Sequence, residues 1–284
     1  MDALDLPAYF RRIGYTGAAA SPDVATLGRL IALHRTAIAF ENIDGLAGRV
    51  PRLDLGSLQR KLVDRRRGGH CFEQNHLFRA VLERLGYRVD GLEGRVRIGV
   101  ASGGPDTPRT HMALRVTIDG VAYLVDVGLG GPTPMAALAQ DERGVQAIDG
   151  ESYRIVDVEH GGEPAWMMQG RADEAWQDIY LLHRRIAGPA DYEVANWFVS
   201  TSPAAVLQTE LILSRPLLDG TRHGLRNDRL MTRHRTGRPK LRRLTARADF
   251  SEVLADIFLL QIDDGDLDAV MATVERARGG ERGH

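Results

Sequence analysis

The stretch HMALRVTIDGVAYLVD, residues 111–126, is the clearest structural unit in this sequence of 284 residues. From Met112 to Ile118, apolar side chains alternate with polar or small ones, which is the period of a β-strand. Asp119-Gly120 is a dipeptide typical of two-residue hairpin turns, and a second apolar run returns from Val121 to Val127. The stretch therefore predicts an antiparallel β-hairpin.

The register of this hairpin places two polar side chains together. A two-residue loop at Asp119-Gly120 pairs Ile118 with Val121, and His111 and Asp126 then lie diagonally opposite on one face. Diagonal neighbours are about 7–8 Å apart, so a carboxylate at this position can orient an imidazole. A three- or five-residue loop would break the parity, and a half-exposed surface pair is the alternative interpretation.

The regions after residue 86 differ in their patterns. Short apolar alternations between Gly, Asp and Pro clusters run from Tyr87 to about Ile155, which predicts an antiparallel sheet or barrel. Beyond about residue 191 the pattern is mixed. There we expect a helix or loop at 194–198 and strands near Leu211 and Leu230. A helix is expected at 250–260, followed by a frayed polar tail at 276–284.

The first 85 or so residues have helical periodicity. Ser21-Pro22 predicts the N-cap and first residue of one helix. A second helix through residues 55–63 is expected to stop at Gly68-Gly69. A third is expected to begin at about Cys71 and to end at Gly86, a natural C′ glycine. Cys71 is therefore expected at a helix N-terminus.

Composition excludes several classes of protein. With 43% apolar residues, 26% charged residues and a net charge of −1, the chain is an ordinary globular sequence without an overall preference for polyanions. It has no leader-like start and no run of about 20 apolar residues, so we expect a cytoplasmic protein with no membrane partner. Its single cysteine excludes an intramolecular disulfide and a multi-cysteine zinc site. Cys71 is then either a buried small apolar residue or a reactive thiol.

Several features around Cys71 favour the reactive thiol. A helix N-terminus and nearby cations lower the pKa of a thiol, and Arg65-Arg66-Arg67 lies just upstream. Gly68-Gly69 lets the backbone turn tightly and approach a substrate closely, although glycine at these positions also fits an ordinary helix C-cap. The sequence has nine histidines that could act as the base. His70 is adjacent to Cys71, and adjacent residues at a helix start point in different directions, while His76 lies off the helix face of Cys71. The register of the 111–126 hairpin therefore favours His111.

A glycine-rich run follows Asp126 directly. Gly128-Leu129-Gly130-Gly131 could present backbone N–H groups to a phosphate or an acyl oxygen. An ordinary turn is also compatible with this run.

Five motifs together resemble one family. Residues 67–75, RGGHCFEQN, resemble the active-site segment of the arylamine N-acetyltransferases of bacterial type, Thr110-His111 resembles their Thr-His element, and residues 125–128, VDVG, resemble their aspartate element. The three occur in the family's order. Residues 39–42, AFEN, and 196–203, NWFVSTSP, are also similar, so the resemblance covers roughly residues 5–205.

The resemblance implies an α+β fold with a cysteine-protease-like active-site arrangement. It implies a helical bundle at 1–88 carrying the nucleophile, an antiparallel β-barrel at 89–195 carrying the His and Asp, and an interdomain segment with an α/β lid at 196–284. Residues 39–42 contribute Glu41, which would form a structural ion pair with Arg67.

The resemblance also implies an activity, a set of site residues and partners. Cys71, His111 and Asp126 would be a catalytic triad that takes an acetyl group from acetyl-CoA onto the thiol and passes it to an arylamine, an arylhydrazine or a related amine. Such ping-pong chemistry belongs to xenobiotic metabolism. Acetyl-CoA would be a cosubstrate, with no tightly bound cofactor and no metal, and the family type allows a homodimer. By the same resemblance, Phe40 and Leu129 would contact the acceptor amine. Thr110, Gly130 and Gly131 would lie near coenzyme A.

Three positions depart from the family pattern. His70 stands where an aromatic residue is usual, Ala39 where proline is frequent, and Leu129 where phenylalanine is common. None belongs to the implied triad. They bear on acceptor preference, and His70 could place a second titrating group near the thiol.

Other functions remain open from sequence alone. An amide synthase of the same family, which releases an acyl chain from a carrier protein onto an amine, would use the same triad. A papain- or transglutaminase-like hydrolase would use the same Cys-His-Asp arrangement. A nucleic-acid-binding protein could use residues 222–243, which hold nine Arg or Lys against one acid, Asp228, although a solvated hairpin with a turn at Gly237 and Pro239 also explains this segment.

Overall fold

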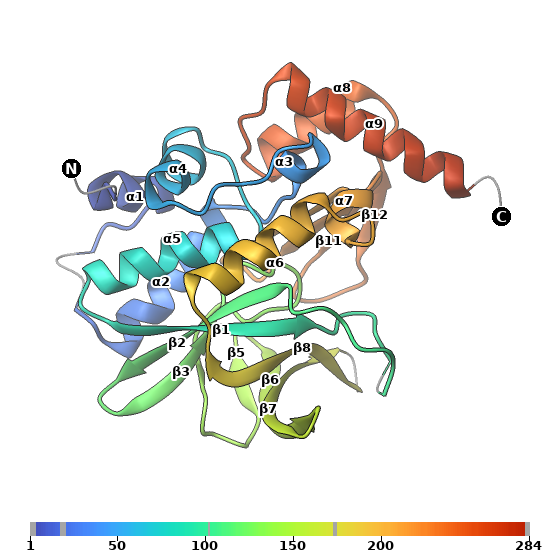
Figure 1. The fold of residues 1–284 in the computed structure, drawn as a ribbon. Coiled ribbons are helices and arrows are strands. Elements are labelled where there is room, and N and C mark those ends of the chain that lie inside the picture. The colour runs from blue at the N-terminus through green and yellow to red at the C-terminus, as the bar shows by residue number, and fades with distance from the viewer. Residues whose placement is uncertain (1–3, 18–20, 102, 173–174, 282–284) are drawn as a thin grey trace.

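The computed structural model describes residues 4–17, 21–101, 103–172 and 175–281, and its first part is helical. The apolar sides of these helices form one core with the first strands of a sheet, to which Leu27 of α2, Phe78 of α5 and Leu114 of β2 contribute. Helices α2 and α5 thus lie over the sheet (Figure 1). The helices before the sheet are α1 (Leu6–Ile13), α2 (Val24–Ala37), α3 (Ile43–Leu46), α4 (Leu55–Leu58), the π-helix η1 (Gln59–Asp64) and α5 (Cys71–Arg84).

Eight antiparallel strands form the central sheet, in the order β4-β3-β2-β1-β8-β7-β6-β5. Apolar side chains from both halves of the sheet, such as Leu124 of β3 and Ile155 of β6, meet in a single buried cluster, so the sheet curls into a barrel-like form. The predicted strand-rich region is therefore confirmed. The strands are β1 (Arg88–Val96), β2 (His111–Ile118), β3 (Val121–Val125), β4 (Leu138–Ala139), β5 (Gln146–Ile148), β6 (Glu151–His160), β7 (Glu163–Ala172) and β8 (Ala175–Ile186).

The hairpin of β2 and β3 has the predicted register. Ile118 pairs with Val121. Asp119 and Gly120 both have positive φ, +49° and +81°, as a type I′ turn requires. Because the ladder ends at Val125, the next residue along the chain begins the loop that follows β3.

The residues after β8 form a smaller α/β part. Its four-stranded antiparallel sheet, in the order β12-β11-β10-β9, packs against helices α8 and α9 around a separate apolar core that includes Phe250 and Val270. The hairpin expected within residues 230–244 is present. The elements are α6 (Pro189–Thr201), α7 (Val206–Thr209), β9 (Ile212–Pro216), β10 (Arg222–Arg226), β11 (Arg229–Arg233), β12 (Lys240–Arg243), α8 (Arg247–Glu252), the π-helix η2 (Val253–Ile257) and α9 (Asp264–Glu281).

Several predicted helix boundaries were wrong. The N-cap of α2 is Asp23, not Ser21, because the Asp23 carboxylate accepts the backbone N–H of Thr26 at 2.7 Å. The second helix splits into α4 and η1 and ends at Asp64, four residues before Gly68.

The C-terminal prediction was also wrong. Residues 276–281 belong to α9 and are not a frayed tail, since Val270 and Val274 pack into the core and Arg278 pairs with Asp228. Residues 282–284 lie outside the described residues. The division into units at 1–88, 89–195 and 196–284, and the role of the last as a lid, stay predictions. No helix among the described residues is long and apolar enough to span a membrane.

Candidate active site

Cys71 is the first residue of α5, as expected, and its side chain is buried. Its Sγ lies 3.6 Å from the carbonyl oxygen of Thr110, at the start of β2. The loop after β3 closes over the same point: a Cβ on Gly128 would lie 2.7 Å from the Cys71 Cα, so only glycine permits this approach. The thiol is thus enclosed between a helix N-terminus and the end of the hairpin.

His111 and Asp126 are brought together at that end of the hairpin. Nε2 of His111 lies 2.9 Å from Oδ2 of Asp126, and both side chains are buried. The other carboxylate oxygen of Asp126 accepts the backbone N–H of Gly128 at 2.8 Å and the Nδ2 group of Asn75 at 3.0 Å. Asp126 therefore has a partner for each of its oxygens, and Nε2 of His111 is the ring nitrogen committed to it.

The charges of this pair change its proton affinity. Burial alone lowers the pKa of His111, but the Asp126 carboxylate, by its charge and its hydrogen bond, and the neighbouring Cys71 thiol outweigh burial and raise this pKa to about 10. Although burial raises the pKa of Asp126, the His111 charge and the hydrogen bonds to the carboxylate lower it overall. Nδ1 of His111 is buried and has no hydrogen bond of ordinary geometry among the described residues. The arrangement can therefore hold an imidazolium beside a thiol.

Asn75 belongs to this site, although the sequence argument gave it no role. Its Nδ2 group also donates to the carbonyl oxygen of Met112 at 2.7 Å, and its Oδ1 accepts the N–H of Val127 at 3.2 Å. It thereby joins α5 to β2 and to the loop that follows β3. The signal that could have found it is its place four residues after Cys71, on the same face of the helix.

Of the residues expected near the acceptor and the coenzyme, Phe40, Leu129 and Gly130 have defined surroundings in the structure. Phe40 is buried and forms isolated bridges to Gly69 and to Ser214 of β9. Gly130 approaches Phe40 so closely that a Cβ on it would lie 3.0 Å from that of Phe40. Leu129 is half-buried against the barrel core. Among these residues, the structure brings Phe40 and Gly130 into contact.

The N–H groups at the two ends of the glycine run are used within the protein, which agrees with the ordinary turn that the sequence also allowed. The N–H of Gly128 donates to Asp126, and that of Gly131 donates to Oγ of Ser214 at 2.8 Å. The run is therefore a loop whose ends are fixed by the protein. Thr110 holds its hydroxyl toward Pro108, and its carbonyl oxygen faces the thiol.

A cleft of about 1100 Å³ lies between the barrel and the smaller sheet. Gly131 is the member of the glycine run that reaches its lining. The lining is rich in cations and also contains two acidic side chains, Glu151 and Asp178. Its basic side chains are Arg97, Arg154, Arg171, Arg222, Arg233 and Arg235.

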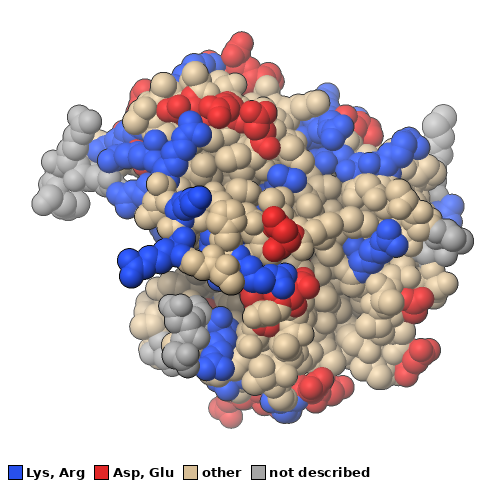
Figure 2. All heavy atoms as spheres, turned by 180° about the vertical axis from the view of Figure 1, so that it is seen from behind, with Lys and Arg blue, Asp and Glu red and all other residues tan. Residues whose placement is uncertain are grey.

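Several arginines of the segment 222–243 form ion pairs. Arg226 pairs with Glu210, and Arg243 with Asp228 at 2.8 Å. Arg222 and Arg233 both pair with Glu151. On the face shown in Figure 2, Lys and Arg side chains lie in several groups with acidic side chains beside them. Part of the positive charge of this segment is therefore held in ion pairs, and Arg222, Arg233 and Arg235 line the cleft.

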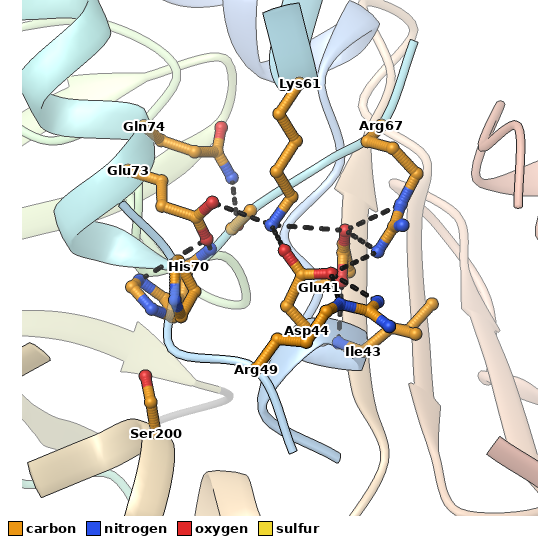
Figure 3. Close-up of polar contacts among 12 residues, drawn as sticks. Glu41, Ile43, Asp44, Arg49, Lys61, Arg67, His70, Glu73, Gln74 and Ser200 are labelled. Carbon is orange, nitrogen blue, oxygen red and sulfur yellow. Dashed lines mark hydrogen bonds and ion pairs between the residues drawn. The ribbon is translucent and has the colours of Figure 1, made fainter. Parts of the chain in front are cut away.

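The charges upstream of Cys71 serve another purpose than expected. Arg67 forms the predicted buried ion pair with Glu41, at 2.9 Å, and so does not act as a free cation beside the thiol. The His70 side chain lies on the side of Glu73 (Figure 3), with Nδ1 3.7 Å from Oε2 of Glu73. Burial lowers the pKa of His70, and neither ring nitrogen has a hydrogen bond among the described residues.

Comparison with known proteins gives consistent relatives. A family model described as N-acetyltransferase matches residues 23–267. The arylamine N-acetyltransferase of Mycobacterium tuberculosis is 39% identical over 266 residues, which cover 92% of this chain and 91% of the relative. The enzyme of the same name from Escherichia coli is 35% identical over 257 residues, covering 90% and 89%.

Solved structures agree with these sequence relatives. The arylamine N-acetyltransferase of Mycobacterium marinum matches with a TM-score of 0.89 at 36% identity, covering 96% of this chain and 99% of the other. A structure of that protein in complex with CoA matches with a TM-score of 0.87, with the same identity and coverage. These structures share the α+β arrangement of helices and curled antiparallel sheet.

Proposed function

This chain belongs to the arylamine N-acetyltransferase family and is an acetyltransferase, and from that premise we propose that it moves the acetyl group of acetyl-CoA to arylamines, arylhydrazines and related amines through a thioester on Cys71. The observation that carries the proposal is the buried contact of His111 with Asp126, beside a thiol at a helix N-terminus. A thiol with a base that is itself oriented by a third group is the arrangement of an activated nucleophile.

In the first half-reaction, the Cys71 thiolate attacks the thioester carbonyl of acetyl-CoA. The new S–C bond forms as a tetrahedral oxyanion develops, which backbone N–H groups at the start of α5 would stabilise. The bond to the coenzyme sulfur then breaks, and the imidazolium of His111 supplies the proton to that sulfur. Asp126 keeps Nε2 of His111 protonated throughout, so that Nδ1 is the nitrogen that exchanges a proton.

In the second half-reaction, the amine attacks the acetyl-cysteine carbonyl. His111 accepts a proton from the attacking nitrogen, the amide leaves, and the Cys71 thiolate is regenerated. Aromatic amines and hydrazines have low basicity and are neutral at pH 7, so their nitrogen lone pair is free to attack. This property is why such acceptors suit the site.

Substrate contacts follow from the same proposal. The relative crystallised with CoA supports use of this donor, and the cation-rich cleft is the place where coenzyme phosphates would be attracted. Thr110, Gly130 and Gly131 would lie near the coenzyme, and Phe40 and Leu129 near the acceptor.

The identity of the donor can be tested directly. We expect acetyl-CoA to support acetylation of an aromatic amine, with parallel lines in double-reciprocal plots against the two substrates, because the first product leaves before the amine binds. A thioester on an acyl carrier protein is the comparison donor. Intersecting lines, or turnover with the carrier thioester alone, would contradict the proposal.

His70 gives a prediction about pH. Because burial lowers its pKa in the folded state, protons bind the unfolded state more readily, and this group destabilises the fold as pH falls below about 6.5. We expect His70→Phe to lose less thermal stability than the wild type between neutral and mildly acidic pH, and to retain acetylation activity further into acid. His70→Tyr, another residue usual at this position in the family, should behave alike. Acid profiles identical to that of the wild type would exclude a role for His70 titration.

A further inference from the structure

A network of charged side chains, buried or partly buried except at Arg49, connects the residues around Cys71 with the C-terminal helix α9. Lys61 of η1, Arg67 and Glu41 converge in the close-up view (Figure 3). Lys61 also pairs with Asp44 at 2.6 Å. Together the network contains three cations and four carboxylates, which are Arg49, Lys61 and Arg67, and Glu41, Asp44, Glu73 and Asp266.

Arg67 is held between two buried carboxylates. Its Nε and Nη2 donate to Oε1 of Glu41 at 3.2 and 2.9 Å, and its Nη1 donates to Oδ2 of Asp266 at 2.5 Å. Asp266 lies in the first turn of α9, 199 residues further along the chain, and its side chain is 4% exposed. Its second carboxylate oxygen pairs with Arg49. The guanidinium of Arg67 is therefore fixed from both ends.

The backbone between Arg67 and Cys71 has little freedom to absorb a movement. A Cβ on Gly68 would lie 2.2 Å from the carbonyl oxygen of Ala39, so the chain passes against that carbonyl as closely as glycine allows. Gly69 then bridges to Phe40 in parallel fashion. A displacement of Arg67 would consequently be passed on to the start of α5.

The network also meets α5 from its other side. Nζ of Lys61 lies 2.7 Å from Oε1 of Glu73, and Oε2 of Glu73 accepts the backbone N–H of His70 at 3.1 Å. This bond caps the first turn of the helix that begins with Cys71. Both the segment leading to the thiol and the first turn following it are thus held by one set of charges.

We propose that Asp266 is a positioning residue for the nucleophile, which acts through Arg67 and ties the placement of Cys71 to helix α9. The inference rests on the proposed role of Cys71 as the acyl acceptor. The C-terminal part of the chain then has a second task besides forming one wall of the cleft, because it fixes the backbone that carries the thiol. A further contact at the same place, from the N–H of Gln261 to the carbonyl oxygen of Arg66, agrees with this task.

Asp228 provides a matched control for simple stabilisation. It is a buried carboxylate of the same C-terminal part, 5% exposed, and it pairs with Arg243 at 2.8 Å and with Arg278 at 2.9 Å. Like Asp266 it joins two arginines, but among the described residues its ion pairs are with Arg243 and Arg278 and not with Arg67. Asp228→Asn should therefore weaken the C-terminal part without loosening the segment that leads to Cys71.

The test compares Asp266→Asn with Asp228→Asn in the full-length protein. Four quantities are measured: thermal stability, the single-turnover rate of Cys71 acetylation, the KM for acetyl-CoA, and the rate of alkylation by iodoacetamide. For Asp266→Asn we expect acetylation and alkylation to slow by about tenfold to a hundredfold with little change in KM, because small displacements of a reacting group have effects of this size. For Asp228→Asn we expect a comparable loss of stability and thiol reactivity close to that of the wild type.

The outcomes separate the inference from the proposed function. Equal thiol reactivity in the two variants, or a loss in Asp266→Asn that appears only in KM, would overturn the role of Asp266. A wild-type protein that forms no acetyl adduct would instead refute the proposed function. Should Asp266→Asn fail to fold, Arg67→Lys keeps the charge but cannot bind Glu41 and Asp266 with one planar group, and wild-type alkylation in that variant would overturn the inference.

Discussion

Asp126→Asn is expected to slow the acetylation of Cys71 by about 10³- to 10⁴-fold without disrupting the fold. One oxygen of Asp126 already accepts two N–H groups, from Asn75 and Gly128. The asparagine would keep its carbonyl oxygen there and turn its NH₂ group toward Nε2 of His111. His111 would then carry its proton on Nδ1, which is the wrong tautomer for taking a proton from the thiol or the amine.

The measurement is a single-turnover reaction with acetyl-CoA, accompanied by thermal unfolding of the variant. Asp90→Asn is the control, since Asp90 lies on the neighbouring strand and pairs with Arg115 at 2.8 Å, away from His111. It should retain nearly all activity. A folded Asp126→Asn protein that acetylates within tenfold of the wild-type rate would show that Asp126 does not orient the base.

Local signals in the sequence were sufficient for the hairpin that carries His111. The Asp119-Gly120 dipeptide accepts positive φ at both positions, which selects the type I′ turn and with it the register. Once the register is set, the period of two decides which face each side chain occupies. The start of α5 at Cys71 and its end before Gly86 followed in the same way from helix-terminus preferences.

Contacts between distant segments could not be predicted in this way. Asn75 stabilises the site by meeting Met112 and Asp126, and this depends on how closely α5 packs on β2. The pairing of Arg67 with Asp266 joins residues far apart in sequence, and nothing local to either residue specifies it.

The errors have a physical cause of the same kind. The final helix turns were expected to fray because their residues are polar, but the apolar side of α9 finds a partner in the C-terminal core. Of the two interpretations of the glycine run, the turn agrees with the structure, because Asp126 accepts the N–H of Gly128 within the loop and Ser214 of β9 accepts that of Gly131. Tertiary partners decided the outcome for α9 and for Gly131.

The second large effect concerns Cys71 itself, because its thiol is the group that would bear the acetyl intermediate. The protein is incubated with acetyl-CoA in the absence of amine, and its intact mass is measured. We predict the gain of one acetyl group, absent in Cys71→Ala, and its disappearance when an aromatic amine is added. Failure to form the adduct at any pH from mildly acidic to alkaline, or an equal adduct in Cys71→Ala, would contradict the role of Cys71 as the acetyl carrier.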